Sequence, residues 1–182
     1  RFSLDPFTDE SVNGLLLNLQ RNNYQPVVLR AFSKDTITAS KMFICIASTT
    51  GFTGDELTYL KEYMTNGGII LLATGYDYKE ASLPLLQTVA ADITQVPLGP
   101  VPYVEGNTTL YQNEPRFVDS WPIQIPINQT ISYYNFTWGD TTYHLVVFIH
   151  YGAGGLLLIS DSQYLLDKNI ESIYDYWPGN IL

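Results

Sequence analysis

Residues 53–73 read TGDELTYLKEYMTNGGIILLA, and this stretch decides the fold class. Thr53-Gly-Asp-Glu56 begins a predicted helix, whose apolar residues recur on one face. Asn66-Gly67-Gly68 is typical of a helix C-terminus. Ile69-Ile-Leu-Leu-Ala73 is apolar at every position, which is typical of a parallel strand covered on both faces. A helix followed at once by such a strand indicates an α/β sheet.

The same alternation extends to both sides of this stretch. Helices are predicted over 9–22, over 78–91 and from Asp161 to about 173, and strands over 2–4, 25–32, 42–48, 143–150 and 155–160. We therefore expect one α/β domain over residues 1–182, with an open, mostly parallel sheet.

The character of the chain changes between residues 92 and 142. Six prolines fall there, and the apolar segments are short: 108–112, 122–127 and 130–138. Gly139-Asp140 predicts a hairpin turn between 131–138 and 143–150. We interpret 92–142 as an antiparallel β insertion in a core made of 1–91 and 143–182, because it is too short for a core of its own.

Charge and cysteine content exclude several classes of function. The net charge is −9 and no run of Lys or Arg occurs, which argues against nucleic acid and anionic membrane surfaces as partners. Cys45 is the single cysteine and lies in an apolar run, so we expect a buried small residue and no intrachain disulfide. No apolar stretch reaches the length of a membrane span, and a tether outside 1–182 is the only membrane attachment expected.

Three N-glycosylation sequons lie in the β insertion, at Asn107, Asn128 and Asn135. Chance alone could supply one or two of them. Together with the low charge and the buried-type cysteine, they favour an exported, extracytoplasmic protein.

Ligands of open α/β sheets bind outside the carboxyl ends of the strands. The residues expected at that edge form a candidate ligand-binding crevice: Asp5, Ser48, Thr49, Gly75, Tyr76, Asp77, Asp161 and Ser162. The plainer alternative is that Asp77 and Asp161 only cap helices. Asp5, Asp77 and Asp161 could together bind a cation, but their wide spacing in the sequence argues against such a site. His144 and His150 would stand about 20 Å apart along one strand, too far to share a metal. No metal or cofactor is therefore predicted.

A family resemblance is carried by short motifs over about residues 1–90 and 143–182. They are Tyr24-Gln-Pro-Val-Val28, Phe43-Ile-Cys-Ile-Ala47, Leu57-Thr-Tyr-Leu-Lys-Glu-Tyr63, Asn66-Gly-Gly-Ile-Ile-Leu-Leu72, Gly154-Gly-Leu-Leu-Leu-Ile-Ser-Asp161 and Asn180. The chain resembles the glutamine-amidotransferase-like domains of uncharacterised membrane-attached prokaryotic proteins, and is similar to gliding-motility ABC-transporter accessory domains. The resemblance implies a flavodoxin-like sheet and a membrane-tethered, extracytoplasmic setting.

The catalytic triad of enzymatic amidotransferases does not carry over to any position. Those enzymes have a cysteine on a strand-to-helix elbow, whereas Thr74-Gly-Tyr-Asp77 has none and Cys45 lies within a strand. We expect a non-catalytic binding or assembly module, accessory to a membrane transporter or surface complex, whose protein partner or small ligand is not specified. The alternatives are a hydrolase or transferase that uses Asp77 and Asp161, with or without a metal, and carbohydrate binding through Trp121, Trp138 and Trp177.

Overall fold

The computed structural model describes residues 11–101 and 117–170. Its helices are α1 (Asn13–Arg21), α2 (Lys34–Thr38), α3 (Gly54–Thr65), α4 (Lys79–Thr88) and α5 (Asp167–Ile170), with 3-10 turns η1 (Tyr76–Tyr78) and η3 (Ile127–Gln129). Its strands are β1 (Met42–Ile46), β2 (Ile69–Ala73), β3 (Asp92–Ile93), β4 (Gly99–Val101), β5 (Phe117–Ser120), β6 (Ile123–Gln124), β7 (Thr130–Trp138), β8 (Thr141–Tyr151) and β9 (Gly154–Ile159).

The main sheet is mixed, with the order β1-β2-β9-β8-β6-β3 and with β7 also paired to β8. β1, β2 and β9 are parallel, whereas β8 is antiparallel to β9, β7 and β6, and β6 is antiparallel to β3. The expected mostly parallel sheet is therefore not confirmed. The reason is the short link between Tyr151 and Gly154, where Gly152 has φ of 63°. A turn this tight joins neighbouring strands only in antiparallel orientation.

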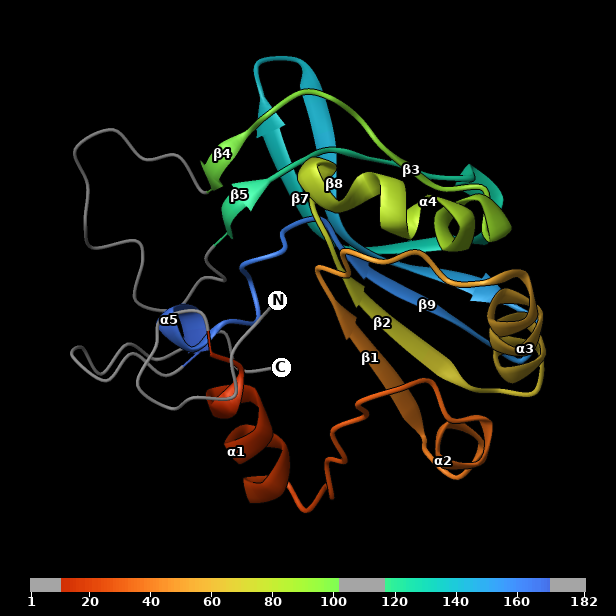
Figure 1. Cartoon of the computed structure of the whole chain (residues 1–182). Coiled ribbons are helices and arrows are strands. Elements are labelled where there is room, and N and C mark those ends of the chain that lie inside the picture. The colour runs from red at the N-terminus through yellow and green to blue at the C-terminus, as the bar shows by residue number, and fades with distance from the viewer. Residues whose placement is uncertain (1–10, 102–116, 171–182) are drawn as a thin grey trace.

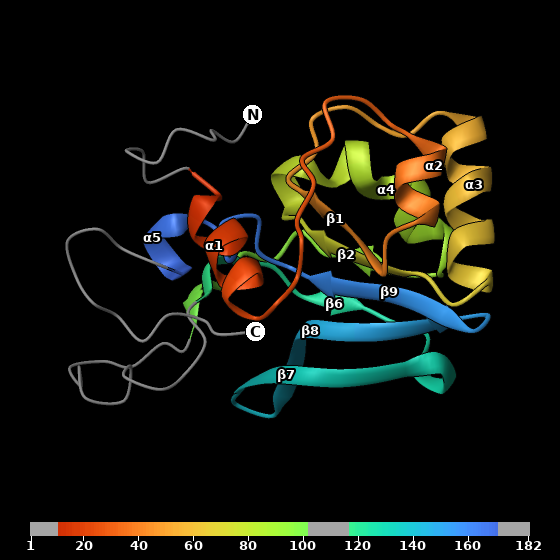
Figure 2. The same cartoon turned by 90° about the horizontal axis from the view of Figure 1, so that it is seen from below.

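Both faces of the sheet are covered, and the side chains of β2 alternate between them. Ile70 and Leu72 belong to one apolar cluster, which includes residues of α2, α3 and α4. Leu71 and Ala73 belong to a second cluster with Leu15 of α1 and residues from the other face. Figures 1 and 2 show α3 and α4 on the opposite side of the sheet from α1. The alternation explains why every residue of this strand is apolar.

The helix and strand predicted within 53–73 are both confirmed. Thr53 Oγ1 accepts a hydrogen bond from the Glu56 backbone N–H at 3.3 Å, and Glu56 Oε2 accepts one from the Thr53 N–H at 2.8 Å. This reciprocal cap fixes the start of α3. Gly67, with φ of 99°, ends it.

The predicted strand at 25–32 is wrong. That segment has no regular structure, and Val27 and Val28 remain 66% and 50% exposed. Apolar β-branched residues favour a strand only where a neighbour completes the ladder, and Pro26 has no N–H to contribute to one.

Three predicted helices are shorter than expected. α4, predicted over 78–91, spans Lys79–Thr88. α1 begins at Asn13, and the residues after Asp161 form turns before the short α5. The strands predicted at 2–4 and 108–112 lie outside the described residues. None of the described helices is long and apolar enough to cross a bilayer.

The proline-rich segment contributes strands to the same sheet as β8. β3, β6 and β7 extend the main sheet, while β4 and β5 pair with each other. The predicted hairpin at Gly139-Asp140 is confirmed between β7 and β8. This segment also brings Trp121 to the edge of the sheet where the candidate site lies.

Candidate functional site

The carboxyl ends of β1, β2 and β9 meet at one edge of the sheet, as parallel strands require. The Ala47 N–H donates to the Ala73 carbonyl at 2.8 Å, and the Thr74 N–H donates to the Ile159 carbonyl at 3.0 Å. A Cβ placed on Gly75 would lie 3.9 Å from Ser162 Oγ. The structure therefore brings Gly75 and Ser162 together, whereas Asp5 lies outside the described residues.

Trp121 occupies the position at this edge where a ligand would be expected. Its backbone N–H donates to the Ser160 carbonyl at 3.0 Å, which anchors it at the end of β9. A Cβ on Gly75 would lie only 3.2 Å from two atoms of the indole ring. The ring also lies 5.3 Å from that of Tyr76, tilted by 32°. Trp121 is 9% exposed and fills the crevice, so it is not a solvent-facing sugar platform.

The indole N–H of Trp121 is buried without a hydrogen-bond acceptor among the described residues. Such a donor costs about 1–3 kcal/mol in desolvation. Sequence reasoning did not place Trp121 in the crevice, because the residue comes from the β5–β6 link, far from β2 and β9 in sequence.

Asp161 is fully buried and holds the β5 end of the insertion against β9. Its Oδ2 accepts from the Val118 and Asp119 N–H groups at 2.5 and 3.0 Å, and its Oδ1 accepts from the Gln163 N–H at 2.7 Å. Burial raises the pKa of this carboxyl group, and the three hydrogen bonds oppose that rise. Both carboxyl oxygens are committed to the backbone.

Asp77 and Asp161 stand in different environments. Asp77 is exposed in η1, whereas Asp161 is inaccessible to solvent. The neighbouring Lys79 forms an ion pair with Asp92 at 2.8 Å and lies 5.5 Å from the centre of the Tyr76 ring. Within 11–101 and 117–170, no three His, Cys, Asp or Glu side chains gather as metal ligands would.

The hydroxyl groups near the crevice bond within the protein. Thr74 Oγ1 and Ser82 Oγ lie 3.1 Å apart, and Ser160 Oγ donates to the Leu145 carbonyl at 3.1 Å. Ser48 Oγ donates to the Thr50 carbonyl at 2.7 Å, while Thr49 is exposed. None of these groups is paired with a base that would make it a nucleophile.

Cys45 is not a reactive thiol. It lies within β1, and burial raises its pKa to about 11 against an opposing hydrogen bond from Ser48. The thiolate, which is the nucleophilic form, is therefore scarce at neutral pH.

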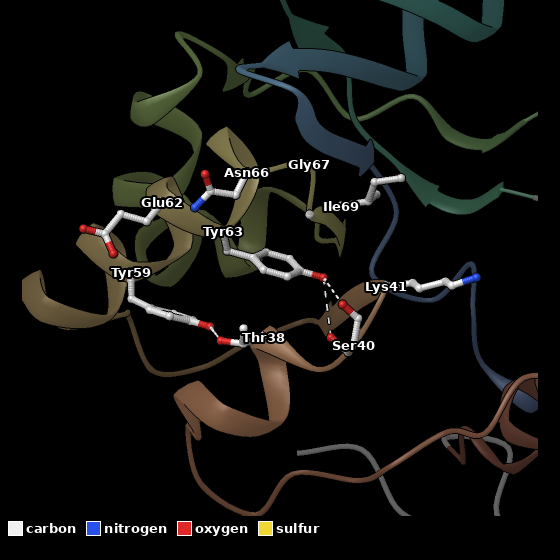
Figure 3. A pocket seen from close by; sticks show the side chains of 10 residues that line it. Thr38, Ser40, Lys41, Tyr59, Glu62, Tyr63, Asn66, Gly67 and Ile69 are labelled. Carbon is white, nitrogen blue, oxygen red and sulfur yellow. Dashed lines mark hydrogen bonds between the residues drawn. The ribbon is translucent and has the colours of Figure 1, made fainter.

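A shallow groove of about 590 Å³ lies at the opposite end of the strands, near the amino ends of β1 and β2 (Figure 3). Tyr63 Oη donates to the Ser40 carbonyl at 3.2 Å, and Tyr59 Oη donates to the Lys34 carbonyl at 2.9 Å. The two rings thus fasten α3 to the segment before β1. No motif marks this groove in the sequence, because it arises from the docking of α2 against α3. It is lined by Thr38, Ser40, Lys41, Tyr59, Glu62, Tyr63, Asn66, Gly67, Gly68 and Ile69.

The two described sequon asparagines, Asn128 and Asn135, are exposed, and Asn107 lies outside the described residues. Asn135 Oδ1 accepts from Ser132 Oγ at 2.6 Å and lies 2.6 Å from His144 Nδ1. His144 thus belongs to a surface cluster on β7 and β8, and His150 packs against Phe148 at 5.0 Å.

Comparisons with known proteins show a shared fold. No protein-family model and no curated protein sequence matches the chain. The N-terminal domain of mmIFT52 is similar with a TM-score of 0.67 and 16% identity, over 86% of this chain and 81% of that one. Cytoplasmic Protein STM1381 from Salmonella typhimurium LT2 is similar with a TM-score of 0.55 and 15% identity, over 82% and 76%.

A protein described as ThuA-like from Bacteroides uniformis ATCC 8492 is similar with a TM-score of 0.52 and 10% identity, over 95% of this chain and 83% of that one. Identities this low carry information about the fold alone. The chain is thus a mixed α/β domain similar in fold to these three proteins.

Proposed function

We propose that this chain is a non-catalytic binding or assembly module. The observation that carries the proposal is the position of Trp121, which fills the edge where α/β domains bind small ligands. Catalysis at this edge would also need a free carboxylate or nucleophile. Asp77 is an exposed carboxylate, but Asp161, its partner in the hydrolase alternative, accepts three backbone hydrogen bonds. Cys45 lies half-buried within β1, and burial raises the pKa of its thiol.

The proposal includes a relationship to glutamine-amidotransferase-like domains with a flavodoxin-like core. Its support is the parallel set β1, β2 and β9, with helices on both faces of the sheet. On this view β3, β6 and β7, which belong to the insertion at 92–142, are additions to that core, and β8 joins β7 to β9.

The proposed setting is extracytoplasmic, on a protein tethered to a membrane outside residues 1–182 and accessory to a transporter or surface complex. The exposure of Asn128 and Asn135 supports this setting, because a glycan needs an accessible asparagine. Protease protection and endoglycosidase shifts of the full gene product in its own cells test it. Loss of the glycosidase shift in Asn135→Gln would identify the modified residue, and a protein digested only after cell lysis would contradict the setting.

The absence of catalysis is tested with chromogenic esters, phosphate esters and glycosides, each with and without Mg²⁺, Mn²⁺ or Zn²⁺. We expect turnover equal to the buffer blank. Asp77→Asn and Asp161→Asn are the matched variants, because they remove the two carboxylates of the hydrolase alternative. Turnover that disappears in either variant while its circular dichroism spectrum stays native would overturn the proposal.

A further inference from the structure

One lateral edge of β1 is open in the part of the chain that the structure describes. Within the described residues β1 pairs on one side only, with β2. Its sequence, MFICI, contains no proline and no charge, and its pairing with β2 has no register shift. β7, by contrast, has register shifts between Ser132 and Asn135. Natural proteins usually protect edge strands with bulges, prolines or charges, so the bare edge of β1 is a candidate docking site.

Exposed apolar side chains lie on the same side of the sheet. Tyr24 and Val27 are 59% and 66% exposed, in the irregular segment between α1 and α2. That segment reaches β1 through Phe32, whose ring contacts Phe43 edge-on at 6.4 Å. Figures 1 and 2 both show the segment on the β1 side of the molecule. The edge is thus accompanied by apolar surface that a partner could cover.

The local charge is opposite to that of the whole chain. Residues 21–41 contain four cations, Arg21, Arg30, Lys34 and Lys41, and one carboxylate, whereas the chain carries a net −9. Arg30, Lys34 and Lys41 are exposed, and no described carboxylate forms an ion pair with them. Lys41 directly precedes β1. We call Arg30, Lys34 and Lys41 the basic margin.

We propose that the free edge of β1 binds an extended, acidic segment of a partner protein, which adds to the sheet as a further strand beside the basic margin. This inference rests on the proposed function of a binding or assembly module and names its partner's chemistry. Main-chain hydrogen bonds supply affinity in this mode, and flanking charges select the partner. A second copy of the chain fits this edge less well, because pairing of two β1 strands would bring two basic margins together and their like charges would repel.

The probes are two fluorescein-labelled peptides with the same Val-Thr-Val-Thr-Val centre. One carries two glutamates at each end, and its twin carries two lysines. Fluorescence anisotropy with the full chain at low salt should show the glutamate peptide binding about tenfold more tightly, with the difference shrinking as salt is added. Arg30→Glu combined with Lys41→Glu should reverse the preference. Lys61→Glu is the matched control, exposed on α3 and outside the basic margin, and should leave it unchanged.

Each other outcome overturns the proposal. Equal affinity for the two peptides would show that the basic margin does not select an acidic partner. Binding of neither would mean that the edge is covered by the chain itself. A dimer in light scattering that Val28→Asp abolishes would identify a second copy as the occupant. If neither peptide binds but the chromogenic substrates are not turned over, only the proposal for β1 fails. If the substrates are turned over but the glutamate peptide binds as expected, only the proposed non-catalytic function fails.

Discussion

Replacing Trp121 with alanine should destabilise the protein by about 2 kcal/mol. A buried tryptophan removes up to about 250 Å² from water, worth roughly 6 kcal/mol at about 25 cal/mol per Å². Truncation to alanine in cores costs about 3–5 kcal/mol, because neighbouring groups relax into part of the space. Removing an indole N–H that has no described acceptor also removes its desolvation cost of about 1–3 kcal/mol, which offsets part of this loss. Subtracting about 2 kcal/mol from about 4 kcal/mol leaves a net loss of about 2 kcal/mol.

A double-mutant cycle with Gly75→Ala tests whether the indole lies where the structure places it. In the native protein the new methyl group would lie 3.2 Å from the ring, and overpacking of this kind costs about 1 kcal/mol or more. Gly75 has φ of −121°, which an alanine adopts freely. In the Trp121→Ala background the same change should therefore be neutral or slightly stabilising.

Urea unfolding followed by circular dichroism gives the four free energies, with the slope m checking that each variant unfolds in two states. A coupling energy of at least about 1 kcal/mol is expected between the two positions. Additive effects, or a loss below about 1 kcal/mol for Trp121→Ala alone, would refute the packing of the indole against Gly75. Trp121 would then not fill the crevice.

Three further results are expected. Burial raises the pKa of Asp161 in the folded state, so the free energy of unfolding should fall as pH rises from the ordinary aspartate pKa, about 4, through the raised pKa. Urea unfolding measured at several pH values should show this fall, and Asp161→Asn should make it smaller. Thr53→Ala should cost about 1 kcal/mol by removing the cap of α3, whereas Thr58→Ala, inside the helix, should cost less. Cys45, with a pKa of about 11, should react with a thiol reagent at pH 7 about 100-fold more slowly than a free thiol, and at the ordinary rate once urea unfolds the chain.

Local features of the fold could be predicted from the sequence because they depend on neighbouring residues. Each of three such features depends on a few consecutive residues: the helix start at Thr53, the helix end at Gly67 and the strand at 69–73 that is covered on both faces. The failed strand at 25–32 has the right composition but no partner for its ladder. Hydrophobicity does not give the direction of β8, because buried parallel and antiparallel strands can have the same apolar pattern. The short link at Gly152 and Ala153 does indicate it, since so tight a turn joins only antiparallel strands.

The candidate site shows the same limit. Gly75 and Ser162 lie close together because both follow strands that end on the same side of the sheet. The sequence did not predict that Trp121 would cover them, because this contact joins segments that no local rule links. The sequence also did not show that Asp161 accepts hydrogen bonds from the backbone of β5. An aspartate after a strand has the same sequence pattern whether it caps a helix, binds a metal or is buried against the backbone.

The position of β9 between a hairpin partner and a distant parallel partner has a consequence for how the chain folds. β7, β8 and β9 are joined by tight turns, so their pairing closes only short loops. The pairing of β2 with β9 must instead close the whole stretch between Ala73 and Gly154. Contacts that close long loops form slowly. The three-stranded hairpin unit should therefore form early, and the β2–β9 joint, together with the crevice beside it, should be assembled late in folding.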